Sequence, residues 1–432
     1  MADGIESDLV ELERAGILSP ETAALVREWY AEKRAPGPNR LILIVGVLGV
    51  LLVGLGIGLL VAHNWDELSR PLKVFFAFLP LLAGQCWAGL TLLKYPGSEM
   101  HREMSATWLA LAIGAAIALV SQIYHLPGSL PPFLLTWLLL GLPLVYTMRS
   151  SVVSLLFVAG ATWYGLEAGN AYPASAKNLW AYWLLLLSVV PYYLYLFKRG
   201  PKGWLAILHH YALPISVLLC MGTLGGNKGS NWLWAAYMGL FGVLYLAGYY
   251  LTSQKVKGAA NAGLVIGWAG VVCLLFMGSF AGFWREMAFS QWDSRDATVK
   301  NIAFWVFIGM FLIGLGLLWV FNRKKLMAVA DPVSYAFLFY ALVFVAGHSS
   351  PGLASIATNV YLLATGVYLL VRGQKEARFG LLNLGLGIIA CLAACRFFDT
   401  YFSFVIRGVL FILVGGGFAF FNYQLIQKKQ TK

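Results

Sequence analysis

Long apolar runs alternate with short polar loops over most of this 432-residue chain. Most runs approach the roughly 20 residues that a helix needs to cross the hydrocarbon core of a membrane. No loop between them is long enough to fold as a separate domain, so the pattern predicts an all-α, polytopic integral membrane protein with about 14 transmembrane helices. The runs cover residues 41–63, 71–93, 105–124, 131–148, 151–168, 179–197, 204–224, 231–252, 259–284, 302–321, 333–347, 353–371, 380–395 and 403–422.

Three of these runs are short for a membrane span, namely residues 131–148, 333–347 and 380–395. A short run is typical of a tilted helix or of a re-entrant segment. These three segments are therefore the candidates for such irregular elements.

The polar segment before residue 41 carries two short helical patterns. Leu9 and Leu12 share one face of a first helix that ends near Gly16. Residues 19–21, Ser-Pro-Glu, supply the N-cap, first-turn proline and first-turn acid that begin a second helix. Two such helices predict a short cytosolic amphipathic αα-hairpin, too small to hold a core alone. We expect it to dock on the membrane domain, on a second copy of the chain or on a protein partner.

The distribution of lysine and arginine indicates which side of the membrane each loop faces, because cytoplasmic loops carry an excess of both. With a cytoplasmic N-terminus, 22 of the 31 basic residues fall on the inner side and eight on the outer side. Both termini are therefore expected in the cytoplasm. The chain divides into the hairpin at 1–40, the transmembrane helical domain at 41–422 and a basic cytosolic tail at 423–432.

Composition supports the same class of protein. Hydrophobic residues make up 60% of the chain, charged residues make up 12%, and the mean hydropathy is +0.74, which lies outside the range of soluble domains. The net charge of +12 does not indicate nucleic-acid binding, because the basic residues form short clusters between apolar runs. The five cysteines lie inside predicted spans without further ligands at metal-binding spacing, so we expect no metal and no cofactor. Membrane lipids are the predicted surroundings.

Polar side chains gather where several predicted spans reach the outer face. A charged group at membrane depth is costly and usually faces the protein interior or an aqueous cavity. Arg407 lies about one turn inside the last span and needs an acid beside it, for which Asp66 and Asp399 are the candidates. Taken one at a time, these residues are also typical of interfacial anchors. Taken together, they predict an outer-face binding site, which we assign to His63, Asn64, Trp65, Asp66, Glu67, Gln122, His125, Arg396, Asp399 and Arg407.

Four stretches of the chain resemble a known family. The hairpin reads ESDLVELERAGILSPETAALVREWYAEKR, the first span ends in AHNWDELSRPLK, the third ends in SQIYHLPG, and RFFDTYFSFVIRGVLFILVGG follows near the C-terminus. This combination resembles the bacterial family of predicted multi-spanning membrane proteins that carry domain of unknown function 2157. The resemblance is clearest over the hairpin and the first four spans. It implies a bacterial inner-membrane protein and no particular activity.

Two non-enzymatic classes of function fit this pattern. A transporter or flippase for a small or lipid-linked solute fits the short loops, the glycine-rich spans and a polar cluster reached from one face. Such a carrier could couple to protons through His63, Asp66 or Asp399, and it should also show residues accessible from the inner side. A non-catalytic assembly or sensor component would instead bind its partners through the hairpin.

A membrane transferase that uses a lipid-phosphate donor is the third class. Asp66 and Glu67 would then bind a metal or activate an acceptor, and Arg396 or Arg407 would hold the phosphate. Chelation of the metal should abolish that activity. The sequence contains no Walker loop, dinucleotide fingerprint, HExxH motif or nucleophile elbow. We therefore favour the transporter and consider an enzyme the weaker interpretation.

Overall fold

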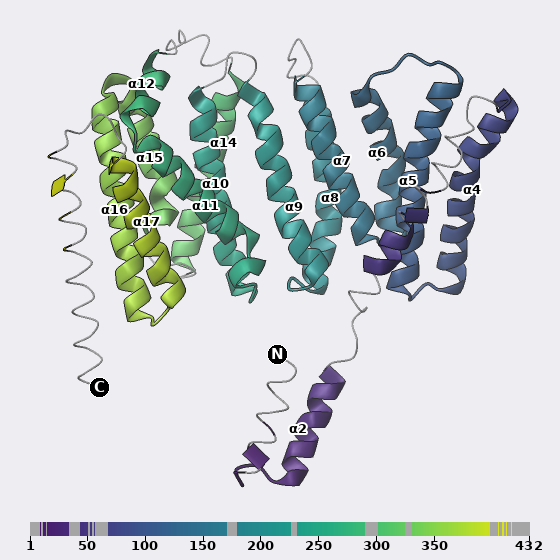
Figure 1. The fold of residues 1–432 in the computed structure, drawn as a ribbon, viewed down its shortest axis with the longest axis horizontal. Coiled ribbons are helices and arrows are strands. Elements are labelled where there is room, and N and C mark those ends of the chain that lie inside the picture. Colours follow the sequence, from purple (N-terminus) through teal and green to yellow (C-terminus); the bar gives the residue numbers. More distant parts are fainter. Residues whose placement is uncertain are drawn as a thin grey trace. The chain divides into compact units, whose positions relative to one another are not determined.

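A computed structural model gives the fold (Figure 1). It describes residues 15–33, 44–50, 68–170, 179–225, 231–289, 301–324 and 331–397, together with a few single positions outside these ranges. Every element with regular secondary structure in this part of the chain is a helix.

In the N-terminal segment, residues 15–19 form the turn between two helical pieces. Leu12 and Glu13 are helical, and Gly16 follows with a φ of +67°, the left-handed conformation in which a glycine commonly ends a helix. Helix α2 then spans Pro20–Lys33. The hydroxyl of Ser19 accepts a hydrogen bond from the backbone N–H of Thr22 at 3.2 Å, so this serine is the N-cap.

Eleven described helices are long and apolar enough to cross a membrane, and a bent pair brings the number to at most 12. Together they match the second to the thirteenth apolar run, which confirms an all-α polytopic membrane protein. The first run and the last lie largely outside the described residues. The eleven helices are α4 (Arg70–Lys94), α5 (Glu99–Ile123), α6 (Leu130–Thr147), α7 (Ser151–Asn170), α8 (Leu179–Arg199), α9 (Trp204–Met221), α10 (Asn231–Ser253), α14 (Ile302–Arg323), α15 (Pro332–Ser349), α16 (Pro351–Lys375) and α17 (Phe379–Phe397).

Among the described spans, the one that breaks is not one of the three short runs. The three short runs form the continuous helices α6, α15 and α17. The span that breaks is the ninth, where α11 (Ala262–Gly278) and α12 (Ala281–Phe289) meet at an angle of 85°. Only Ser279 and Phe280 separate the two helices, and the apolar run continues through them. The apolar pattern therefore gave no sign of the break.

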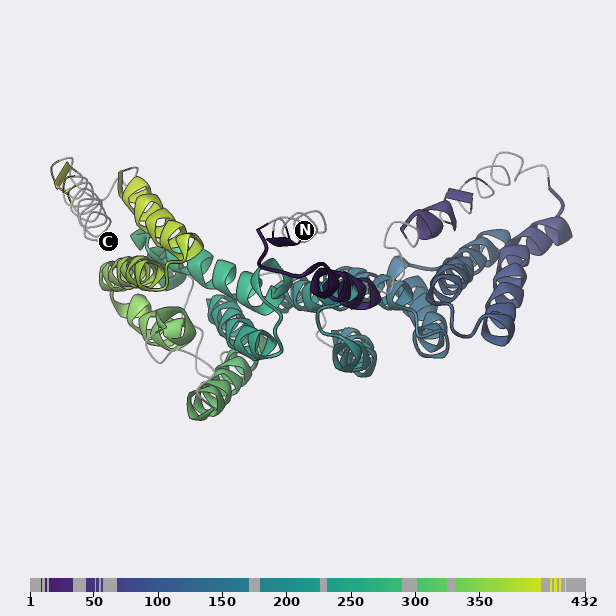
Figure 2. The same ribbon diagram turned by 90° about the horizontal axis from the view of Figure 1, so that it is seen from below.

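The chain forms two compact units. The first contains Met1–Ser129 and Leu139–Ser154, and the second contains Leu130–Leu138 and Leu155–Lys432. In the first unit α4 packs along α5, and the indole N–H of Trp108 donates to the carbonyl of Pro80 at 3.0 Å. In the second unit α10, α11, α14, α15, α16 and α17 form a bundle, whose green and yellow-green helices are seen nearly end-on in Figure 2. Two short 3-10 turns, η3 (Gly222–Gly225) and η4 (Gly258–Ala260), lie on either side of α10.

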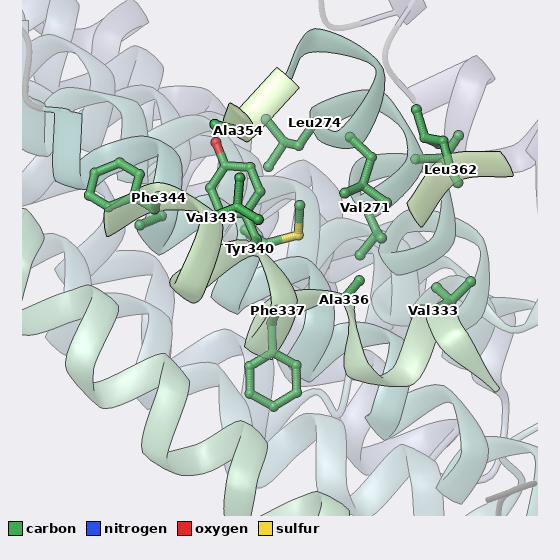
Figure 3. Close-up of a cluster of buried hydrophobic side chains, with 14 of the residues drawn as sticks. Val271, Leu274, Val333, Ala336, Phe337, Tyr340, Val343, Phe344, Ala354 and Leu362 are labelled. Atoms are coloured by element: carbon green, nitrogen blue, oxygen red, sulfur yellow. The ribbon is translucent and has the colours of Figure 1, made fainter. Parts of the chain in front are cut away.

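Helix α15 is central to the core of the second unit. Phe337, Tyr340 and Phe344 repeat at helical spacing and are all at most 2% exposed. They pack with Val271 and Leu274 of α11 and with residues of α16 (Figure 3). This core holds α11, α12, α15 and α16 together around the break.

Candidate functional site at the broken helix

Three charged side chains are buried among the residues whose side chains the structure describes. They are Glu103, Asp331 and Arg396, which are 5%, 1% and 6% exposed. Burying a charge is costly unless hydrogen bonds or an opposite charge compensate it. The partners of each residue therefore show whether it has a structural role or can serve a ligand.

Glu103 is a structural residue of the first unit. Its carboxylate accepts hydrogen bonds from the backbone N–H groups of Ser151 at 2.7 Å and Val152 at 3.1 Å, and from the hydroxyl of Ser150. These donors form the start of α7, where the helix dipole favours an anion. The carboxylate therefore ties α5 to the first turn of α7.

Asp331 has the same kind of role in the second unit. It is the N-cap of α15 and accepts from the N–H of Val333 at 3.2 Å and from the hydroxyl of Ser334 at 3.1 Å. Two tyrosines of α10 add their hydroxyls, Tyr245 at 2.8 Å and Tyr249 on the same carboxylate oxygen. Four donors satisfy this anion, which thereby joins α10 to α15.

Arg396 differs from both, because it lies on an irregular piece of backbone. Its guanidinium donates a hydrogen bond from Nη2 to the hydroxyl of Ser279 at 3.2 Å. The same group lies over the ring of Phe280, with 4.5 Å from its central carbon to the ring centroid. Ser279 and Phe280 are the two residues at which α11 turns into α12. A permanently charged side chain of α17 is thus bound to the break itself.

Other side chains satisfy the backbone of the break. The carbonyl of Ser279 accepts from the hydroxyl of Ser355 at 2.6 Å and from the amide nitrogen of Asn359 at 2.8 Å, both on α16. The carbonyl of Gly278 accepts from the indole N–H of Trp284 at 2.6 Å. Irregular backbone at membrane depth persists only where such partners exist. We call Ser279, Phe280, Ser355, Asn359 and Arg396 the break site.

Close packing fixes the position of the turn. Trp284 of α12 is fully buried, and its ring centroid lies 5.7 Å from that of Tyr340 on α15. A methyl group on Gly347 of α15 would come 2.4 Å from Cε3 of this indole, so only a glycine fits there without displacing α12. In this structure the break is therefore closely packed against α15 and α16.

The structure describes three of the ten residues assigned to the outer-face site. Gln122 and His125 are exposed at the end of α5, and His125 has a φ of +49°, as in a polar turn after a helix. They belong to the first unit, whereas the buried Arg396 belongs to the second. The remaining seven lie outside the described residues, so the shared outer cavity stays a prediction: His63, Asn64, Trp65, Asp66, Glu67, Asp399 and Arg407.

Sequence reasoning missed most of the groups that surround Arg396 and the other buried charges. The polar pattern pointed only to the outer face, whereas Glu103 and Asp331, beside predicted inner loops, are buried and hydrogen-bonded. Asn359 was the available signal at the break, since an amide in the middle of an apolar span needs a partner. Over the part of the chain that the structure describes, no three His, Cys, Asp or Glu side chains are grouped to hold a metal ion.

Comparison with known proteins identifies the N-terminal third of the chain. Residues 11–154 match the family model described as "Predicted membrane protein (DUF2157)". This segment is similar to that family, and we call residues 11–154 the DUF2157 region. The match confirms the resemblance seen over the hairpin and the following spans, and it ends at Ser154, where the first unit also ends. No curated protein and no solved structure matches the chain.

The break site lies entirely outside the DUF2157 region, between residues 279 and 396 of the second unit. The family description names a membrane protein and no activity. Any function of the break site must therefore be argued from its own side chains.

Proposed function

We propose that the protein is a transporter or flippase for a small or lipid-linked solute, and that the α11–α12 break is its moving part. The observation that supports this proposal is a buried arginine, Arg396, bound to the two residues at which a membrane helix bends by 85°. Carriers commonly bind their solutes at helices that are interrupted within the membrane. The proposed site of action is the bacterial inner membrane, with both termini in the cytoplasm.

The chemistry of the break supports binding as well as movement. Ionisable groups inside membrane proteins are costly, and they usually mark a solute or ion pathway. A guanidinium offers several donors in one plane and binds carboxylate or phosphate groups well. The carbonyl of Ser279 is held by only two side chains of α16, Ser355 and Asn359, which can exchange partners if α12 swings.

Exposed apolar side chains in the hairpin favour a second role, binding of a protein partner. Ile17 and Leu25 are 71% and 65% exposed. Apolar side chains left uncovered on a small helical element are typical of a docking surface. In this second role the membrane helices anchor a non-catalytic component.

Accessibility of Ser279 tests the transporter proposal. The five native cysteines are replaced, Ser279→Cys is introduced, and vesicles of both orientations are treated with a membrane-impermeant maleimide. An alternating-access carrier predicts labelling of Cys at position 279 from both sides, because the break must open to each in turn. Labelling from one side alone, or from neither, contradicts the proposal.

Three further single-cysteine proteins serve as controls in the same experiment. Gly128→Cys and Lys257→Cys lie in exposed loops, predicted outer and inner respectively, and each should react from one side only. Ser216→Cys replaces a buried serine that is hydrogen-bonded between α7 and α8. It should react from neither side.

A further inference from the structure

Two buried polar atoms near the break have no hydrogen-bond partner in the described part of the chain. They are the hydroxyl oxygen of Tyr340 and Oδ1 of Asn359. Tyr340 is only 1% exposed. Buried polar groups are nearly always paired, so an exception calls for a specific cause.

Both atoms belong to residues that surround the break. The amide nitrogen of Asn359 donates to the carbonyl of Ser279, so the unpaired oxygen of the same amide lies next to the turn. The ring of Tyr340 packs against Trp284, whose indole donates to the carbonyl of Gly278. Figure 3 shows the hydroxyl of Tyr340 pointing toward Ala354, the residue before Ser355. Helices α15, α16 and α17 thus each contribute a polar side chain to the region of the break.

The three groups differ in what they can bind. Arg396 supplies positively charged N–H donors, and Tyr340 supplies a hydroxyl donor. Oδ1 of Asn359 is an acceptor only, so it requires a hydrogen from the ligand. An inorganic anion without hydrogen leaves Oδ1 of Asn359 without a donor. A cationic ligand is repelled by the guanidinium of Arg396.

From this set of groups we infer that the break site, together with Tyr340, binds a polyol phosphate, a phosphate group with a neighbouring alcohol. The phosphate oxygens accept from Arg396 and Tyr340, and the tetrahedral group offers oxygens in several directions to donors from different helices. The alcohol O–H donates to Oδ1 of Asn359. This inference names the substrate class of the proposed transporter and so depends on that proposal for its biological meaning.

The same chemistry occurs in two sources. A glycerophospholipid with a glycerol headgroup carries it at the membrane surface, and a free polyol phosphate carries it in solution. The test therefore uses phosphatidylglycerol and glycerol 3-phosphate as separate probes.

Thermal unfolding of the purified full-length protein in a maltoside detergent measures binding by either probe, because a ligand of the folded state raises Tm. We expect a rise in Tm with phosphatidylglycerol, with glycerol 3-phosphate or with both, and the effective probe identifies the source. Phosphatidylcholine, glycerol and sulfate serve as controls and should leave Tm unchanged. If neither probe raises Tm above these controls, the site holds no polyol phosphate and the inference is overturned.

A pair of tyrosine variants links binding to the break. Tyr340→Phe removes a hydroxyl without a protein partner, so the free protein should unfold at the wild-type temperature or higher, while Kd for the effective probe rises about tenfold. Tyr361→Phe is the matched control, since this hydroxyl donates to the carbonyl of Pro332 at 2.6 Å. It should lower the Tm of the free protein and leave Kd unchanged. A wild-type Kd in Tyr340→Phe would overturn the assignment.

Failure of this inference can be distinguished from failure of the transport proposal. Binding without labelling of Cys at position 279 from both sides means that the site recognises a polyol phosphate but does not transport it. Labelling from both sides without binding of either probe means that the protein is a carrier for another solute, which overturns the inference alone.

Discussion

At the scale of the residue, the buried charges separate into two kinds. Glu103 and Asp331 are surrounded by donors that belong to the protein, and each joins a pair of helices. Arg396 is instead attached to the two residues of an interrupted helix. The first kind stabilises the fold, whereas the second places a cation at an irregular turn of the backbone.

Replacement of Asp331 by asparagine tests the structural role. The amide is neutral and has one acceptor oxygen, so it cannot satisfy Tyr245, Tyr249, Ser334 and a backbone N–H together. We expect Asp331→Asn to lower the free energy of unfolding by about 2 kcal/mol, measured by thermal denaturation. Tyr245→Phe removes one donor and should cost less, about 1 kcal/mol. An Asp331→Asn protein as stable as wild type would show that the carboxylate does not join α10 to α15.

The sequence indicated Arg396 but could not indicate its partners. An arginine at the end of an apolar run is visible in any hydropathy pattern, and its burial follows from the cost of exposing a charge to lipid. Ser279 is 117 positions away in the chain, so only the fold brings it to Arg396. Asp331 was overlooked because it resembles an ordinary helix cap before Pro332, whereas the tyrosines that bury it lie 82 and 86 positions earlier.

At the scale of the element, the break in the ninth span is the feature that apolar patterning could not predict. Helix length and hydropathy placed the other described spans well, because both follow directly from the thickness of the membrane. A kink depends instead on which side chains fill the space beside it. The glycine of α15 that faces Trp284 is such a determinant, and its role appears only once the two helices are packed.

Gly347→Ala tests whether packing of Trp284 maintains the break. The added methyl group would meet the indole at 2.4 Å, so Trp284 must move and its hydrogen bond to Gly278 weakens. We expect a loss of about 1–3 kcal/mol in the free energy of unfolding, as for other overpacked sites, measured by thermal denaturation. Gly352→Ala is the matched control, because nothing lies within 4 Å of the added methyl group. Equal stability of the two variants would contradict the packing argument.

At the scale of the whole molecule, the chain combines two units that differ in how much the sequence alone reveals about them. The first overlaps the DUF2157 region, whose resemblance to that family was recognisable from short polar motifs at the ends of spans. The second lies outside that match, and its candidate site emerges only from the fold. The membrane class could thus be predicted from composition and from the lengths of the apolar runs alone. The site required the three-dimensional arrangement of α11, α12, α16 and α17.

The transporter proposal requires that α12 moves within the second unit. Spin labels at two exposed positions, Glu286→Cys on α12 and Lys257→Cys at the opposite end of the bundle, report this movement in a protein without native cysteines. Pulsed electron paramagnetic resonance in liposomes then gives the distance distribution between the labels. A control pair, Lys257→Cys with Leu353→Cys on α16, spans the fixed part of the bundle.

We expect two distance populations for the pair that includes α12 and a single population for the control pair. Two populations are expected because an alternating-access carrier must occupy at least two arrangements of its moving element. A single narrow distribution for both pairs would contradict the account, because the break would then be a rigid part of the fold.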